Sequence, residues 1–188
     1  TATIKEEDVV EHLFVTSNLS QLLFFTNKGK VHWLKAYLIP EASKYAKGTN
    51  LVNLLRLDKE EKISAILPVK SFDENLNLMF ATKKGGVKKT RLNEFSNPRQ
   101  GGILAIKLHE NDEVVAVRLC SSGMKFILGS KNGRAVKFLE NDVREMGRIT
   151  GGVRGIRLIN DELIGMEVAL DDGDLLTGTE NGYGKRTA

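Results

Sequence analysis

Short apolar runs alternate with polar turns along the chain, and one phrase occurs four times. Each copy has an apolar run that ends near a small hydroxyl residue, a polar turn with a glycine, and a second run that is mostly basic. The apolar runs are residues 22–26, 78–82, 126–130 and 175–179, and the turn glycines Gly29, Gly85, Gly133 and Gly182 lie 56, 48 and 49 residues apart. Two short runs around such a turn predict a β-hairpin, most clearly at Asn132-Gly133 and Asn181-Gly182, because a type I′ turn needs positive φ at both positions.

Two further repeated motifs lie between these hairpins, and they are called the second and third phrases. The second phrase is a glycine followed by apolar positions that close on a leucine, and it occurs at residues 48–57, 101–108 and 151–158. The third phrase is an acidic turn followed by another apolar run. These runs are residues 63–69, 114–119 and 163–168, and residues 9–15 are an earlier copy of the run. The chain therefore contains an internal repeat of about fifty residues.

The repeat predicts an all-β fold. Each unit supplies three or four short strands, and the chain has no long stretch with the 3.6-residue period of a helix. A unit of this size cannot bury both faces of a sheet, so we expect neighbouring units to pack side by side like propeller blades. The approximate units are residues 1–57, 58–108, 109–158 and 159–188 of one domain, which we expect to be part of a larger array.

Composition excludes several classes of protein. The chain has 188 residues, 41% hydrophobic and 28% charged, which is typical of a folded globular protein. No apolar stretch has the length of a transmembrane helix, and a single cysteine, Cys120, allows no internal disulfide and favours a reducing compartment. The net charge of +4 and the pI near 9.1 indicate nucleic acid only weakly.

The arrangement of the charges says more than their sum. Acidic residues gather just before the apolar run of the third phrase, at residues 6–8, 58–62, 110–113 and 160–162. Basic residues gather around the glycine hairpins and the second phrase. If equivalent positions stack, this pattern predicts a basic belt and a separate acidic edge, and the belt would bind DNA phosphates. The candidate DNA contacts are Lys28, Lys30, Lys35, Lys44, Lys47, Lys83, Lys84, Lys88, Lys89, Arg91, Arg99, Lys131, Arg134, Lys137, Arg148, Arg154, Lys185 and Arg186. The alternative interpretation is an ordinary solvated edge of a β protein.

The sequence indicates no catalytic site, no metal site and no cofactor in this chain. His12, His32 and His109 lie far apart, and one cysteine cannot complete a zinc pattern. The glycines near residue 184 lack the spacing of a phosphate-binding loop. The carboxylate pairs fall in the acidic turns, where solvated loops explain them.

Several runs are similar to one family. Residues 6–10, 47–55, 151–158 and 179–187 closely resemble the C-terminal domain of bacterial DNA gyrase A, and the likeness covers essentially the whole chain. The resemblance implies a β-pinwheel, of which this chain would supply about four blades, that binds and wraps double-stranded DNA. It implies that the rest of gyrase A and the gyrase B protein are partners, and that ATP and Mg are used in other domains during negative supercoiling. It also implies a bacterial cytoplasmic location at the nucleoid. The alternatives are the matching domain of topoisomerase IV and a propeller-like protein-interaction module.

The chain departs from the family at one motif. The Gln-Arg-Arg-Gly-Gly-x-Gly box of the family is not present, and by the repeat alignment its place falls upstream of Thr1. Degenerate forms of it occur at residues 99–102 and 148–152. We expect phosphate contacts at both places, because glycines let backbone amides approach an anion beside an arginine.

Overall fold

The predicted hairpins are present, and each belongs to a different antiparallel sheet. The type I′ prediction is wrong, because Asn132 and Asn181 do not have positive φ; only the glycines that follow them do. The structure is a computed structural model, and it describes residues 12–43, 46, 48–73 and 75–187. In strand order, the first sheet contains β3 (Ile63–Val69), β1 (Gln21–Thr26), β2 (Lys30–Lys35) and β6 (Ile103–Leu104), and the second contains β7 (Val114–Cys120), β4 (Asn77–Thr82), β5 (Gly86–Arg91) and β10 (Val153–Arg154). The third sheet contains β11 (Leu163–Ala169), β8 (Lys125–Ser130) and β9 (Ala135–Leu139), and the fourth contains β12 (Leu175–Gly178) and β13 (Gly184–Thr187). The all-β prediction is therefore confirmed.

Short 3-10 turns are the helical elements of the described residues. They are η1 (Ala36–Leu38), η2 (Leu51–Asn53), η3 (Leu92–Phe95) and η4 (Glu140–Asp142). Three of them, η1, η3 and η4, directly follow the second strand of a hairpin, so they end the strand at the same place in three repeats.

The first two sheets interlock with the repeats that follow them, because each takes strands from a later part of the chain. In the first sheet, β6 joins β2 with Val31 opposite Ile103, and in the second sheet β10 joins β5 with Val87 opposite Val153. The residues after β6 and β10 also bind the hairpin turns: the amides of Ala105 and Ile106 donate to the Gly29 carbonyl, at 2.8 and 3.1 Å. A sequence unit such as residues 58–108 thus contributes strands to two sheets.

The first strands of the first two hairpins, β1 and β4, are buried on both faces, which explains their unbroken apolar runs. Successive side chains of a strand point to opposite faces. Leu23 and Phe25 therefore lie in the core between the first and second sheets, whereas Phe24 lies in a separate cluster on the other face. The first of these cores also contains Phe80, whose ring contacts Phe25 edge to face with the centroids 5.5 Å apart.

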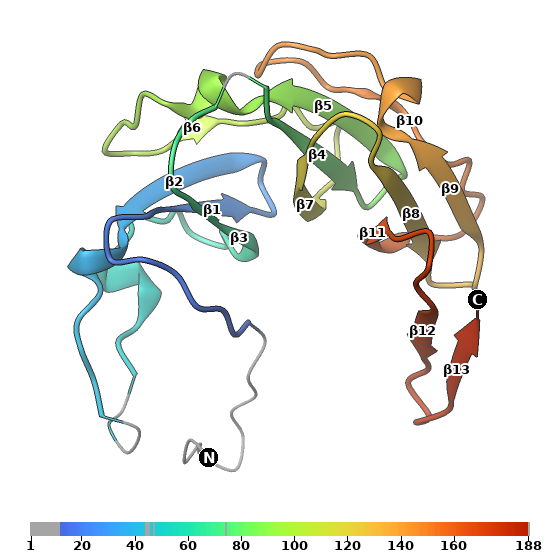
Figure 1. Ribbon diagram of the computed structural model, residues 1–188, viewed down its shortest axis with the longest axis horizontal. Coiled ribbons are helices and arrows are strands. Elements are labelled where there is room, and N and C mark those ends of the chain that lie inside the picture. Colours follow the sequence, from blue (N-terminus) through green and yellow to red (C-terminus); the bar gives the residue numbers. More distant parts are fainter. Residues whose placement is uncertain (1–11, 44–45, 47, 74, 188) are drawn as a thin grey trace.

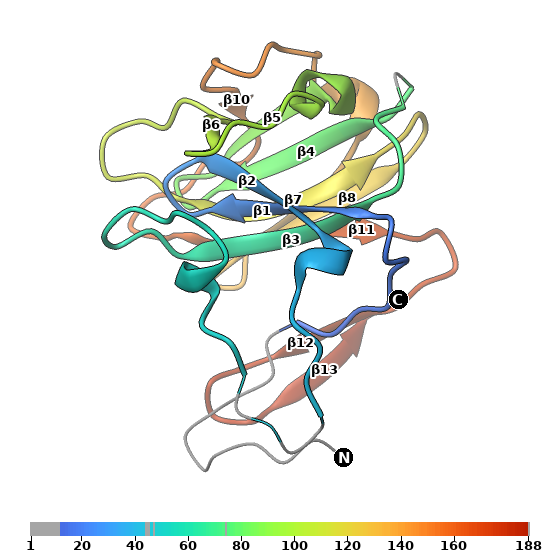
Figure 2. The same ribbon diagram turned by 90° about the vertical axis from the view of Figure 1, so that its left-hand side faces the viewer.

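The sheets follow one another along an arc (Figure 1). The strands β3, β7 and β11 lie toward the inside of the arc and contact one another in sequence, and β6 and β10 lie toward its outside. Figure 2, turned by 90°, shows the first sheet with β3, β1, β2 and β6 in that spatial order. The side-by-side packing expected from the repeat is what the structure shows.

One predicted strand differs. Residues 9–15 repeat the sequence of β3, β7 and β11, but residues 12–15 form no strand and are exposed, and the rest of the run lies outside the described residues. The three later copies each pair with the hairpin that precedes them, β3 with β1, β7 with β4 and β11 with β8.

Candidate nucleic-acid interface

The acidic turns lie directly against the hairpin turns. The Lys30 ammonium pairs with Asp58, and the Glu162 carboxylate pairs with both Lys83, at 3.0 Å, and Lys131, at 3.4 Å. Lys30 lowers the pKa of the Asp58 carboxyl, and Lys83 lowers that of Glu162, because a neighbouring cation favours the charged carboxylate. The expectation of a basic belt separate from an acidic edge is therefore wrong at the hairpin turns.

The strand pairing explains this arrangement. β3 runs antiparallel to β1 with Thr26 opposite Ile63, so the acidic turn that precedes β3 arrives at the turn end of the hairpin. The acidic residues then bind the turn backbone: the amide of Lys84 donates to Asp112 Oδ1 at 2.9 Å, and that of Asn132 donates to Asp161 Oδ1 at 3.1 Å. These two carboxylates hold the turn backbone, whereas Asp58 and Glu162 of the acidic turns pair with the cations beside them.

Lys88 is fully buried and therefore is not available to a phosphate. Its ammonium donates to the carbonyls of Ala105, at 2.7 Å, and Arg148, at 2.5 Å, with longer bonds to those of Gly147 and Thr150. Burial lowers the pKa of this lysine to about 7. Lys88 connects the segment after β6 to the segment before β10, so its role in this structure is to join two repeats.

Lys89 is also buried. Its ammonium bonds to the Glu140 carboxylate at 2.5 Å and to the Glu140 carbonyl at 2.9 Å, and both side chains are more than nine-tenths buried. The sequence prediction that Lys88 and Lys89 contact DNA is corrected here, because neither ammonium faces solvent.

The other predicted cations fall into two groups, and Lys44 and Lys47 lie outside the described residues. In one group the charged end of the side chain forms an ion pair or donates a hydrogen bond to a carbonyl. This group contains Lys30, Lys83 and Lys131, together with Arg91, which pairs with Glu145, and Arg186, which pairs with Asp174. It also contains Lys84, which donates to the Glu110 carbonyl, and Arg148, which donates to the Leu104 carbonyl. In the other group the side chains are exposed and form no ion pair within the described residues; these are Lys28, Lys35, Arg99, Arg134, Lys137, Arg154 and Lys185.

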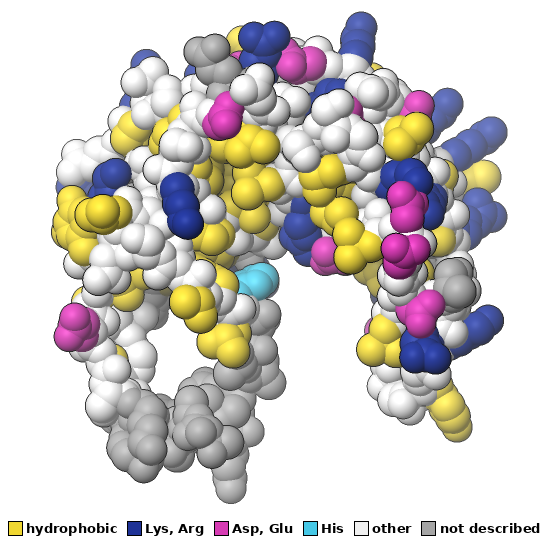
Figure 3. Space-filling model, viewed as in Figure 1, with side chains coloured by type: hydrophobic (Ala, Val, Ile, Leu, Met, Phe, Trp, Pro, Cys, Tyr) yellow, Lys and Arg dark blue, Asp and Glu magenta, His cyan; other side chains and the backbone are white. Residues whose placement is uncertain are grey.

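Basic side chains project from the outer side of the arc, most densely over the third sheet (Figure 3). Lys137 lies on β9, the strand at the outer edge of that sheet, and Arg154 lies on β10, at the outer edge of the second. The structure thus brings part of the predicted set to one side of the molecule, and that side is the candidate interface.

The glycines of the degenerate boxes have a packing role. A Cβ on Gly102 would lie 2.8 Å from the His32 ring and 2.9 Å from the Val31 carbonyl, and one on Gly152 would lie 2.5 Å from the Val87 carbonyl. Both glycines have positive φ, +74° and +88°. At these two positions the glycines let an outer strand approach the hairpin strand with which it shares a sheet, rather than let a backbone amide approach an anion.

Three exposed cations were missing from the sequence prediction. Arg56, Lys107 and Arg157 each stand one residue before the leucine that closes the second phrase, and all three are exposed. The alignment of the second phrase alone contains the signal, since the position is basic in every copy.

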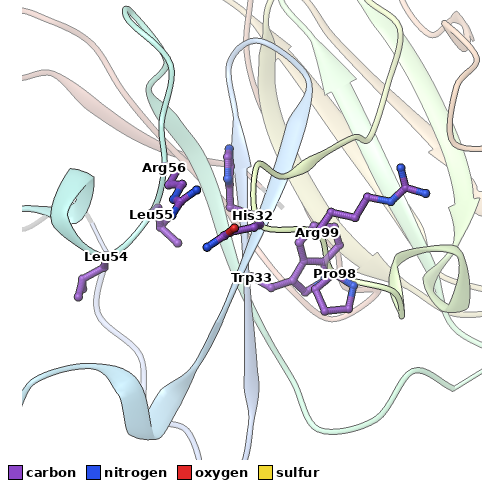
Figure 4. A pocket seen from close by; sticks show the side chains of 8 residues that line it. His32, Trp33, Leu54, Leu55, Arg56, Pro98 and Arg99 are labelled. Atoms are coloured by element: carbon purple, nitrogen blue, oxygen red, sulfur yellow. The ribbon is translucent and has the colours of Figure 1, made fainter.

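A hollow of about 290 Å³ lies beside one of these cations (Figure 4). It is lined by His32 and Trp33 of β2, by residues 54–56 and by residues 98–100. Arg56 lies on one side of His32, and Arg99 lies on the other with its guanidinium extended away. The His32 ring is buried against Glu61, with Nε2 3.3 Å from the carboxylate, so it is a packed side chain at the base of a basic, solvent-facing hollow.

Other chemistry is limited in the part of the chain that the structure describes. Cys120 ends β7 with no exposed surface, and burial raises the pKa of its thiol to about 11, so it is not poised as a nucleophile. Within the described ranges, no three His, Cys, Asp or Glu side chains are grouped so that they could hold a metal ion. The described helical turns are all too short to cross a membrane.

Comparisons with known proteins match both the repeat and the fold. A family model described as the DNA gyrase C-terminal domain, a β-propeller, matches residues 20–70, 76–121, 125–169 and 173–188, and each matched segment contains one hairpin. The DNA gyrase A protein of Salmonella typhimurium is 46% identical over 188 residues, which are all of this chain and 21% of that protein. The chain thus spans about a fifth of the length of the curated relatives it matches.

Two solved structures are similar throughout the arc. The C-terminal domain of a DNA topoisomerase IV has a TM-score of 0.87 and 27% identity, over 98% of this chain and 58% of that one. A DNA gyrase A C-terminal domain has a TM-score of 0.75 and 29% identity, over 91% of this chain and 55% of that one.

Proposed function

Because the chain belongs to the family of DNA gyrase C-terminal domains, we propose that it binds double-stranded DNA without sequence preference and wraps it along the outer side of the arc. The observation that carries this proposal is the group of exposed cations on that side that have no carboxylate partner within the described residues. Cations of this kind release condensed counterions when they contact phosphates, and they do so without reading bases.

A curved arrangement of contacts is what a wrapped duplex requires. Bending a site of 20–30 base pairs by 40–90° costs on the order of 1–6 kcal/mol, so several phosphate contacts must offset that cost. Lys35, Lys137 and Lys185 lie on or next to the second strands of three hairpins, which belong to different sheets along the arc. Cations distributed in this way would hold a bent duplex at several points.

We propose that the domain works within a gyrase. The likeness to gyrase A supports the remainder of that protein and the gyrase B protein as partners. DNA cleavage and ATP hydrolysis with Mg would take place in those parts, in the bacterial cytoplasm at the nucleoid. Wrapping would present a DNA segment with a fixed handedness and so bias strand passage toward negative supercoils.

Binding to random-sequence duplex DNA across a salt series tests the proposal. The logarithm of the binding constant is expected to fall linearly with that of the salt concentration, with a slope of about −0.9 per phosphate contacted. Replacing Lys35, Arg99 and Lys137 with glutamine is expected to make the slope shallower. Lys59→Gln, Lys62→Gln and Lys70→Gln together remove the same charge from the acidic turn and the end of β3, and are expected to change it much less. Salt-insensitive binding by the native chain, or equal effects of the two triples, would refute the proposal.

A linking-number assay then separates wrapping from plain binding. The likeness to the C-terminal domain of a DNA topoisomerase IV supports a second candidate, a domain of a topoisomerase IV, for which we propose DNA binding without wrapping. A plasmid relaxed in the presence of the chain and then stripped of protein is expected to keep a shifted linking number if the DNA is wrapped. An unshifted plasmid, with binding intact, would favour the second role.

A further inference from the structure

Lys107 and Arg157 occupy the same place in successive repeats. Each follows an isoleucine whose amide donates to the glycine carbonyl of a hairpin turn: Ile106 to Gly29 at 3.1 Å, and Ile156 to Gly85 at 3.2 Å. Arg56 occupies the corresponding sequence position, after Leu55 and before Leu57.

The neighbours of these cations fix their direction. In each copy the residue before and the residue after the cation are apolar and pack into the molecule, as Leu55 and Leu57 do around Arg56. Ile106 and Leu108 pack in the same way around Lys107. A side chain between two inward-facing neighbours on an extended chain points outward, and all three cations are indeed exposed.

These cations also differ from those of the hairpin turns in their charge environment. Within the described residues, none of Arg56, Lys107 and Arg157 forms an ion pair, whereas the acidic turns neutralise Lys30, Lys83 and Lys131. Lys107 and Arg157 each lie three residues after the outermost strand of a sheet, β6 or β10. Three successive repeats thus each carry one exposed cation with no ion-pair partner within the described residues, and two of the three follow the outer edge strand of a sheet.

The chemistry of the position indicates the ligand. The residue is Arg, Lys and Arg in the three copies, so the positive charge recurs but the planar guanidinium does not. Reading a base edge or a planar carboxylate favours the fork of arginine, whereas a phosphate can be neutralised by either residue. We propose that Arg56, Lys107 and Arg157 form an outer cation row, in which each repeat contacts one backbone phosphate of the wrapped duplex. This inference rests on the proposed function and adds to it contacts that come from outside the hairpins.

A triple substitution tests the outer cation row. Together, Arg56→Gln, Lys107→Gln and Arg157→Gln are expected to make the slope of the logarithm of the binding constant against that of the salt concentration shallower by about 2.7, which is three contacts at about 0.9 each. The control is again the Lys59, Lys62 and Lys70 glutamine triple, which removes the same charge. Because all six side chains are exposed, both triples are expected to keep the far-UV circular dichroism and melting temperature of the native chain.

The possible outcomes distinguish a failure of the outer cation row from a failure of the proposed function. If the native chain shows no salt-dependent binding, the proposed function fails and the row fails with it. If the native chain binds but the row triple has the native slope, or changes it no more than the control triple does, the row is refuted and the DNA-binding proposal stands. Single substitutions refine the test: each is expected to reduce the steepness by about 0.9, and a change confined to one of the three would overturn the inference of one contact per repeat.

Discussion

Alanine in place of Gly85 probes the interlocking of the sheets. Gly85 lies in the turn of the second hairpin with φ +85°, and a Cβ there would lie 2.7 Å from the Ile156 carbonyl oxygen and 2.9 Å from Ile156 Cγ2. The Gly85 carbonyl also accepts from the amides of Gly155 and Ile156, at 2.9 and 3.2 Å. Gly133 has the same turn position and a similar φ, +81°, but a Cβ there would meet nothing within 4 Å. It is therefore a matched control for the backbone strain.

The two costs can be separated. Alanine at positive φ costs about 1–2 kcal/mol, and this cost is common to both glycines. At Gly85 the backbone carbonyl of Ile156 must also move, which weakens two hydrogen bonds worth about 1 kcal/mol each. We therefore expect Gly85→Ala to lower the free energy of unfolding by about 3–4 kcal/mol, and Gly133→Ala by about 1–2 kcal/mol.

Urea unfolding followed by far-UV circular dichroism measures both values. Gly29→Ala serves as a second test, because its Cβ would lie 2.6 Å from the Ile106 carbonyl, and it is expected to behave like Gly85→Ala. If Gly133→Ala destabilises the chain as much as the other two, the backbone strain alone sets the cost. The conclusion that the turn glycines are required by the approach of another repeat would then be wrong.

Two further predictions concern the buried lysines. Burial lowers the pKa of Lys88 from 10.5 to about 7. Between these two pH values the unfolded chain binds more protons than the folded chain. The contribution of Lys88 to the free energy of unfolding is therefore expected to increase with pH, by up to about 1.4 kcal/mol per pH unit. Urea unfolding from pH 7 to 9 should show a smaller rise in Lys88→Met, and equal rises would contradict the assignment. Glu140→Gln leaves the buried Lys89 ammonium without its carboxylate and is expected to lower the free energy of unfolding by about 3 kcal/mol. Glu167→Gln breaks the exposed pair with Arg118 and is expected to lower it by less than about 1 kcal/mol in the same assay.

The strands were predictable because their signals are local. Turn glycines and short apolar runs located the hairpins, and the third phrase matched β3 at residues 63–69. The pairing of β6 and β10 was not predictable in this way, because each has only two residues and takes its partner from another sequence unit. Residues 12–15 show the limit of the pattern, since they belong to a run with the sequence pattern of a strand but form no strand.

The exposed cations are less predictable than the strands, because the density of charge along the chain does not show where each side chain points. Lys88 and Lys89 are adjacent on β5, so they must point to opposite faces of the sheet. Both faces of β5 are buried, so neither lysine lies at the surface. The same reasoning identifies Lys107, whose two apolar neighbours face inward and leave it outside. Where both faces of a sheet are buried, the burial of the flanking residues is therefore a better guide to which cations are exposed than the local density of positive charge.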